Sequence, residues 1–85
     1  DEVLDILRSV ETVELVALLT ERQGKVKLSL RSKSHIDANQ IARDLGGGGH
    51  VRAAGATLDG IAFDDALEKV RKACVLAVQE AAATS

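Results

Sequence analysis

Aromatic residues are almost missing from this sequence: it has no tryptophan and no tyrosine, and Phe63 is its only phenylalanine. A protein that binds single-stranded nucleic acid by stacking each base on a ring needs a row of such residues, so that mode of binding is excluded. The hydrophobic share is nevertheless 46% of 85 residues. This composition is typical of one small folded domain with a core of leucine, valine, isoleucine and alanine.

Cysteine is scarce as well. The single residue, Cys74, excludes an internal disulfide framework and a four-cysteine zinc site. No apolar run approaches the ~20 residues of a membrane-spanning helix, and the acidic pair Asp1 and Glu2 stands where a signal peptide would be basic. We therefore expect a cytoplasmic protein without a membrane partner. The missing initiator methionine further suggests a piece of a longer protein.

Groups for catalysis are a third absence. Hydrolysis by a metal-activated water needs a cluster of carboxylates and histidines. His35 and His50 instead stand apart, and most acidic residues fall in the first turns of expected helices or at the edges of expected strands. No Ser-His-Asp arrangement is recognisable. We expect no catalytic residue, no metal ion and no other cofactor in this domain.

Charge is present but unevenly distributed. Residues 22–52 contain seven basic and two acidic residues, a net charge of +5, although the whole chain carries −2. Proteins that coat nucleic acid usually have a high pI, whereas the pI of this chain is about 5.6. A basic segment in an acidic domain indicates a single site for an anionic ligand.

The spacing of apolar residues predicts an α+β fold: a small mixed sheet that contains an antiparallel hairpin and is covered by helices. The expected elements are a helix at 2–10, strands at 12–20, 25–31 and 53–58, a short helix at 38–45 and a long amphipathic helix at 63–81. The first strand is apolar on both faces, which predicts a central position. Cys74 lies on the apolar side of the last helix, where we expect it to be buried.

The short helix has clear start and stop signals. Asp37 is placed to cap its first turn, with Gln40 completing a capping box, and Ile36 and Ile41 occupy the positions of a hydrophobic staple. Gly46 follows the last helical residue, where a left-handed residue commonly ends a helix.

The stretch DLGGGGHVRAAGATL, residues 44–58, joins this helix to the next strand. Beyond Gly46, we expect Gly47 to Gly49 to orient their backbone N–H groups into a concave anion-binding nest. His50 and Arg52 would stand at its rim as side-chain donors. A flexible hinge is the alternative reading of the run, although no linker composition surrounds it.

Residues 29–32, SLRS, add a second group of polar side chains on the strand before the helix. Arg31 and Ser32 would offer a guanidinium and a hydroxyl to a phosphate. For Arg31, a solvated strand face is an equal alternative. His35 has no supporting neighbours, and we expect it on a loop surface.

The segments SLRS and IARDLGGGGHVRAAG, with the closing amphipathic helix, resemble the C-terminal DHH-associated (DHHA) domain of the DHH-family phosphoesterases. The likeness covers nearly all of residues 1–85 as a single domain, and GGGH followed by AAG is a specific motif. It is greatest to the NrnA-like subgroup, the bacterial bifunctional oligoribonucleases and 3′-phosphoadenosine 5′-phosphate phosphatases.

This resemblance implies a division of labour. In such proteins an N-terminal domain with an Asp-His-His motif holds manganese and hydrolyses a phosphoester, while the domain seen here binds the substrate. The residues implied to contact the terminal nucleotide are Gly46, Gly47, Gly48, Gly49 and His50, and those implied for its phosphate are Arg31, Ser32 and Arg52. The Asp-His-His motif is absent from the sequence, so hydrolysis by this domain alone is not expected.

Two functions remain open on these grounds. The first is binding of a short single-stranded RNA or DNA, or of a mononucleotide, beside a DHH catalytic domain. RNA, DNA, 3′-phosphoadenosine 5′-phosphate and cyclic dinucleotides are not distinguished by the sequence. The second is a structural module that associates with itself, as in a homodimer, without binding a ligand.

Overall fold

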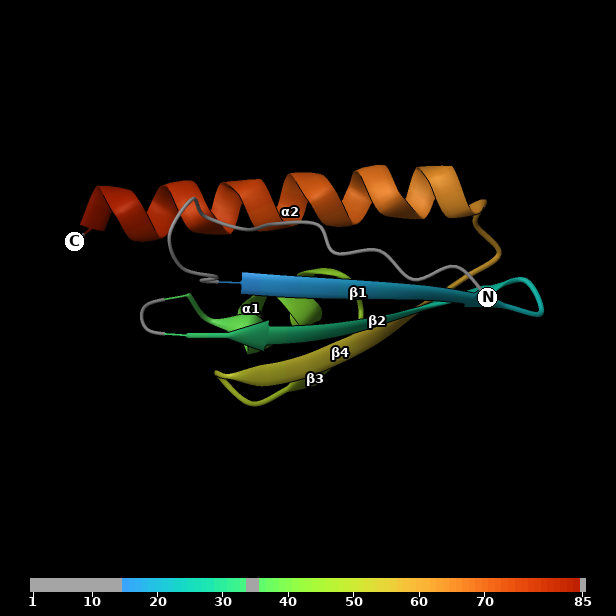
Figure 1. Ribbon diagram of the computed structural model, residues 1–85, viewed down its shortest axis with the longest axis horizontal. Coiled ribbons are helices and arrows are strands. Elements are labelled where there is room, and N and C mark those ends of the chain that lie inside the picture. Colours follow the sequence, from blue (N-terminus) through green and yellow to red (C-terminus); the bar gives the residue numbers. More distant parts are fainter. Residues whose placement is uncertain (1–14, 34–35, 85) are drawn as a thin grey trace.

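The computed structural model describes residues 15–33 and 36–84 (Figure 1). The helix expected at 2–10 and His35 lie outside the described residues. The described elements, in chain order, are β1 (Leu15–Arg22), β2 (Lys25–Ser32), α1 (Ala38–Asp44), β3 (Gly48–Gly49), β4 (Ala53–Asp59) and α2 (Phe63–Thr84). They confirm an α+β fold with a β-hairpin, a short helix and a long C-terminal helix.

The strands form one sheet in the order β1-β2-β4-β3. Every pairing among the described strands is antiparallel, so the expectation of a mixed sheet is wrong. The reason is the two-residue strand β3, which the sequence pattern does not reveal. β3 runs in the same direction as β2, and the tight loop after β3 reverses the chain. β4 therefore lies beside β2 and runs antiparallel to it.

β1 lies at an edge of the sheet, which contradicts its predicted central position. Leu15, Ala17 and Leu19 are buried on one face of β1, whereas Val16 and Leu18 on the other face are half-buried. The apolar residues on both faces therefore reflect partial burial at the edge of the sheet. They do not indicate a strand with two neighbours.

The β1–β2 hairpin forms as predicted around Gln23 and Gly24. These two residues connect the paired residues Arg22 and Lys25, and both have positive φ angles of 54° and 79°. A two-residue loop with two positive φ angles matches the right-handed twist of the strands it joins. This local geometry fixes the register of the first two strands.

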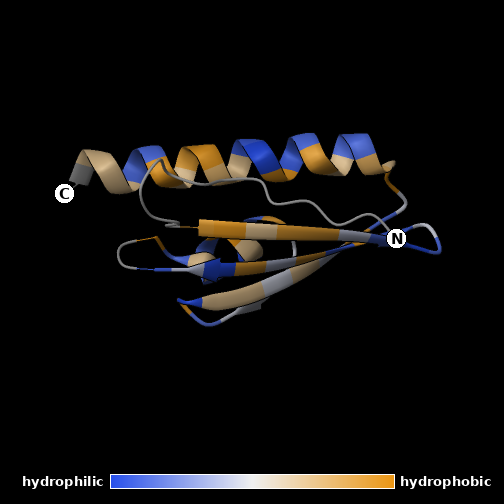
Figure 2. Ribbon diagram, in the orientation of Figure 1, coloured by the Kyte–Doolittle hydropathy of each residue, from blue (hydrophilic) through white to orange (hydrophobic). Residues whose placement is uncertain are grey.

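The core lies on one face of the sheet. Rows of paired residues cross three strands on this face, as in Leu19, Leu28 and Ala56, and all three are buried. α2 adds a fully buried stripe of Ala66, Val70 and Cys74. Hydrophobic and hydrophilic patches alternate along α2 in Figure 2, as expected for a helix that buries one side.

The other face of the sheet is open. The residues that alternate with the buried ones in β2 include the exposed Lys27 and Arg31 and the half-buried Ser29, and no described helix covers them. α1 and α2 both contribute buried residues to the core on the opposite face. In the described part of the chain, neither helix is long and apolar enough to cross a membrane. The fold thus presents a two-layer body with one exposed sheet surface.

Candidate functional site

The position of the glycine run is set first by the start of α1. The carboxylate of Asp37 caps the helix by accepting a hydrogen bond from the Gln40 N–H at 3.1 Å. The Gln40 side chain donates to Asp44 at 3.0 Å, so only the Asp37 half of the predicted capping box forms. Ile36 and Ile41, at the staple positions, are both buried in the core.

The end of α1 turns the chain back toward the sheet. The N–H of Gly46 donates to the carbonyl of Arg43 at 3.1 Å, and the N–H of Gly47 donates to the carbonyl of Ala42 at 2.7 Å. This pair of bonds, with a positive φ of 90° at Gly46, is a Schellman motif. The predicted role of Gly46 as the residue that ends the helix is confirmed.

Close packing accounts for two further glycines. A Cβ atom on Gly47 would lie 2.1 Å from the carbonyl oxygen of Gly55, and one on Gly49 would lie 2.6 Å from the Cα of Ala54. A Cβ on Gly48 would meet nothing closer than 3.7 Å. The run is therefore built into the sheet as β3 and its approach, and it is not a flexible hinge.

The backbone donors of the run are engaged within the chain. Besides the two bonds at the helix end, the N–H of Gly49 donates to the side-chain oxygen of Asn39 at 3.0 Å. His50 and Ala53 exchange two backbone bonds of 2.8 and 3.2 Å, and the alternation of an antiparallel ladder makes Gly48 and Gly55 the next bonded pair. The prediction that Gly47 to Gly49 offer free N–H groups to an anion is therefore wrong.

The glycines instead line a shallow hollow on the open face of the sheet. This hollow has a volume of about 560 Å³ and is bordered by Gly46 to Gly49, by Lys27, Ser29 and Arg31 of β2, and by Ala53 to Thr57 of β4. Its size lies within the range of about 300–1,000 Å³ that is usual for ligand pockets. Because its floor is mostly glycine and alanine, a ligand can approach the main chain closely.

Positive charge borders the hollow, and no carboxylate of the described residues forms an ion pair with it. Lys27 and Arg31 are exposed, and among the described residues the Arg31 guanidinium donates only to the neighbouring carbonyl of Leu30, at 3.1 Å. Within residues 15–33 and 36–84, one ion pair is formed, between Arg71 and Glu68 on α2 at 2.7 Å. The cations of the hollow are thus available to an anionic ligand.

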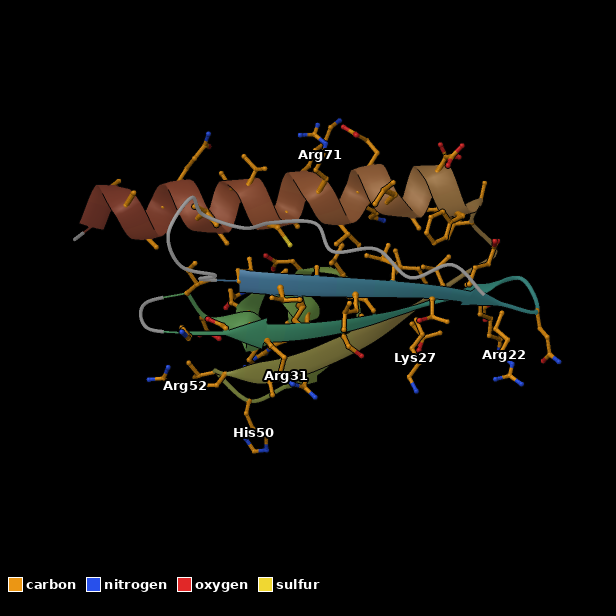
Figure 3. The ribbon with its side chains drawn as sticks, in the orientation of Figure 1. Arg22, Lys27, Arg31, His50, Arg52 and Arg71 are labelled. Carbon is orange, nitrogen blue, oxygen red and sulfur yellow. The ribbon has the colours of Figure 1, made fainter. Side chains whose placement is uncertain are left out.

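His50 and Arg52 do not line the hollow, but they lie on the tight loop that joins β3 to β4, between Gly49 and Ala53, which do. The loop is held at three points: His50 pairs with Ala53, the Ala38 N–H donates to the carbonyl of Val51 at 2.7 Å, and the Ser32 N–H donates to the carbonyl of Arg52 at 2.9 Å. In Figure 3 the labelled side chains of Arg31, His50 and Arg52 extend on the side of the sheet away from α2. The structure therefore places these three predicted residues on the same side of the molecule, opposite α2.

Ser32 has a different surrounding from the one predicted. Its hydroxyl donates to the carbonyl of Ile36, the second residue before α1. A hydroxyl has one proton, so while this bond is formed Ser32 does not donate to a phosphate.

Sequence reasoning missed two residues at this site. Lys27 borders the hollow, and the alternation of polar residues along β2 was a sufficient signal for it. The side chain of Asn39 accepts a hydrogen bond from Gly49, ten positions later in the chain, and no local sequence pattern predicts such a contact.

The ionisable groups with shifted pKa values lie away from the hollow. Burial raises the pKa of the Cys74 thiol to about 11, and its side chain is fully buried, which confirms its predicted place in the core. On α2, the hydrogen bond from Arg71 lowers the pKa of the Glu68 carboxyl. Neither group contributes to the site.

Comparison with known proteins identifies relatives of the chain. A sequence profile of the DHHA1 domain matches residues 1–76. A curated protein of Thermus thermophilus, described as a bifunctional oligoribonuclease and PAP phosphatase NrnA, is 45% identical over 73 residues. The aligned part is 86% of this chain and 22% of that protein, so the chain spans about a fifth of the relative's length.

Proposed function

Because this chain belongs to the DHHA1 domain family, we propose that it binds the phosphate-bearing end of a short oligonucleotide or nucleotide for a DHH catalytic domain in the same protein. The observation that carries this proposal is the hollow on the open face, with a floor of small residues and, at its border, cations that form no ion pair with a described residue. A nucleotide uses both features, because its phosphate is attracted by positive charge and its sugar and base need room.

The proposed roles of the residues follow from their places. Arg31 and Arg52 bind the phosphate, since a guanidinium donates two parallel hydrogen bonds to phosphate oxygens. His50, exposed on the loop beside the hollow, contacts the terminal nucleotide. Gly46 to Gly49 supply the floor on which the ligand lies, in place of the donor nest that the sequence suggested.

Hydrolysis is proposed to occur outside this chain. In the described part of the chain, no three His, Cys, Asp or Glu side chains lie close enough together to hold a metal ion. Manganese and bond cleavage would belong to the DHH domain. The description of the Thermus relative as an oligoribonuclease and PAP phosphatase supports short RNA and PAP as the substrate classes to test first.

The direct test is a titration of the isotope-labelled chain with adenosine 5′-monophosphate and with a 5′-phosphorylated diadenylate, followed by amide chemical shifts. We expect the shifts to concentrate at residues 27–31 and 46–57. Shifts confined to α2, or none at millimolar ligand, would refute the proposal.

Three arginine variants refine this test. Arg31→Ala and Arg52→Ala should each weaken diadenylate binding by about 1.5–3 kcal/mol, the value of a hydrogen bond to a charged group. Arg71→Ala removes the same side chain from the opposite side of the molecule (Figure 3) and should leave binding unchanged. Equal losses in all three variants would indicate a general charge effect instead of a site.

Self-association is the second candidate function, and a separate observation favours it. An apolar groove of about 470 Å³ lies between α1 and the second half of α2, and Leu76 at this groove is 56% exposed. Sedimentation equilibrium of the chain and of a Leu76→Glu variant tests this candidate. A dimer that the substitution dissociates would support it, and a monomer at all concentrations would exclude it.

A further inference from the structure

Asn39 is the only side chain of α1 with a hydrogen bond to the glycine run among the described residues. It is the second residue of the helix and is half-buried. Its Oδ1 accepts the N–H of Gly49 at 3.0 Å. This contact links the start of α1 to the residue that immediately precedes His50.

The bond satisfies a donor that the sheet itself leaves open. β3 is an edge strand, and Gly49 pairs with Ala54 at a position where the two residues exchange no backbone bonds, because the adjacent pair of His50 and Ala53 does. The Gly49 N–H therefore points away from β4, toward the position of a missing neighbouring strand. Asn39 supplies the acceptor that such a strand would supply.

A second bond from the same turn of α1 lies on the other side of His50. The N–H of Ala38 donates to the carbonyl of Val51 at 2.7 Å. Consecutive residues of α1 thus hold the residues before and after His50. A two-residue edge strand has few bonds of its own to fix its direction, so these two contacts act together with the His50–Ala53 backbone pair to fix where the His50 side chain is presented.

We propose that Asn39 is a positioning residue that fixes His50 beside the hollow through the N–H of Gly49. This inference rests on the proposed function for its ligand, and on the two hydrogen bonds from Asn39 and Ala38 for the positioning itself. It makes the side-chain oxygen of Asn39, rather than its amide nitrogen, the necessary group.

Three variants test the proposal in this chain. Asn39→Ala removes the acceptor. Asn39→Asp keeps an oxygen at the same position, and a carboxylate near a helix N-terminus is tolerated. Gln40→Ala is the matched control, because it deletes a neighbouring amide side chain with one hydrogen bond of 3.0 Å, to Asp44.

Hydrogen exchange at the Gly49 amide is the first measurement. In Asn39→Ala we expect exchange faster than in the unsubstituted chain by roughly 2–10-fold, the range for one net hydrogen bond. The side-chain resonances of His50 should move with it. Asn39→Asp should restore both readouts, whereas Gln40→Ala should change neither.

Affinity for the 5′-phosphorylated diadenylate is the second measurement. Asn39→Ala should lower this affinity by roughly 2–10-fold. The midpoint of urea denaturation should be the same for Asn39→Ala and Gln40→Ala. Asn39→Asp adds a negative charge near the hollow. Rescue by this variant is therefore measured by hydrogen exchange at the Gly49 amide and not by affinity.

The outcomes separate the two proposals. If the unsubstituted chain binds no diadenylate, the proposed function fails, and the Gly49 exchange and His50 resonances still decide the positioning role. Unchanged exchange in Asn39→Ala, or an affinity loss no larger than that of Gln40→Ala, overturns the inference about Asn39.

Discussion

Replacing Gly47 by alanine should destabilise the fold far more than the same replacement at Gly48, one residue further along the run. The added methyl group at Gly47 would lie 2.1 Å from the carbonyl oxygen of Gly55 and 2.7 Å from the Cα of Ala56. Both are backbone atoms, which cannot rotate away. At Gly48 the nearest atom is 3.7 Å away, an ordinary contact, and it belongs to the Asn39 side chain.

The expected magnitudes follow from these distances. Relief of the Gly47 contact requires β3 and β4 to move apart, so we expect a cost of at least about 3 kcal/mol, the upper end for overpacking. Gly48→Ala should be neutral or stabilising by up to about 1 kcal/mol, because alanine restricts the unfolded chain. A domain of this size has a total stability of roughly 4–13 kcal/mol, so the first change removes a large part of it.

Urea denaturation followed by far-ultraviolet circular dichroism measures both variants. In thermal unfolding, Gly47→Ala should lower Tm by more than about 12 °C, at 4–8 °C per kcal/mol for a domain of this length. A flexible hinge would accept alanine equally at both positions. Equal free energies of unfolding for Gly47→Ala and Gly48→Ala would therefore refute the packing role assigned to the run.

Gly48→Ala also tests the position of the ligand. Gly48 borders the hollow, and a methyl group there would meet only the Asn39 side chain, at 3.7 Å, so it adds bulk at the border of the hollow without disturbing the fold. We expect weaker binding of the diadenylate without a loss of stability. Unaltered affinity would place the ligand elsewhere on this face.

Three further predictions concern charge, capping and burial. The logarithm of the diadenylate affinity should fall as the logarithm of the salt concentration rises. Arg52→Ala should reduce the slope of this dependence by about 0.7, the value for one phosphate contact on a single strand. An unchanged slope would show that Arg52 does not contact the phosphate. Asp37→Ala should lower the free energy of unfolding by about 1 kcal/mol in urea titrations, because it deletes the N-cap of α1, and no change would show that the cap is dispensable. The Cys74 thiol ionises at an ordinary pKa of 9.0 when unfolded and at about 11 in the fold, so the unfolded state loses its proton first. Stability should therefore fall between about pH 9 and pH 11 relative to a Cys74→Ala variant, and parallel pH profiles of the two proteins would contradict this.

Elements fixed by neighbouring residues were predictable from the sequence. The β1–β2 hairpin depends on Gln23 and Gly24 alone, and the ends of α1 depend on Asp37 and Gly46. Each of these signals lies within a few residues of the structure that it produces. The long amphipathic helix was equally clear, because its apolar spacing extends over several turns.

Features that depend on distant pairing were not predictable. β3 consists of two glycines, which carry no side-chain pattern, and its pairing with β4 makes the sheet antiparallel. The prediction of a nest of free N–H groups is wrong for the same reason: the acceptor for the Gly49 N–H is the side chain of Asn39, ten residues earlier. The alternation of Lys27 and Arg31 with leucines predicts the cationic face of β2. The hollow on this face could not be predicted, because it forms only where β2 pairs with β4.

The loop that carries His50, Val51 and Arg52 is anchored entirely through main-chain atoms, from Ser32, Ala38 and Ala53. Such anchoring is indifferent to the side chains that the loop displays, and all three are exposed. A library randomised at Val51 and Arg52 should therefore contain mostly folded members that differ in what they bind. The same scaffold can diversify its ligand preference in evolution or in the laboratory without rebuilding its core.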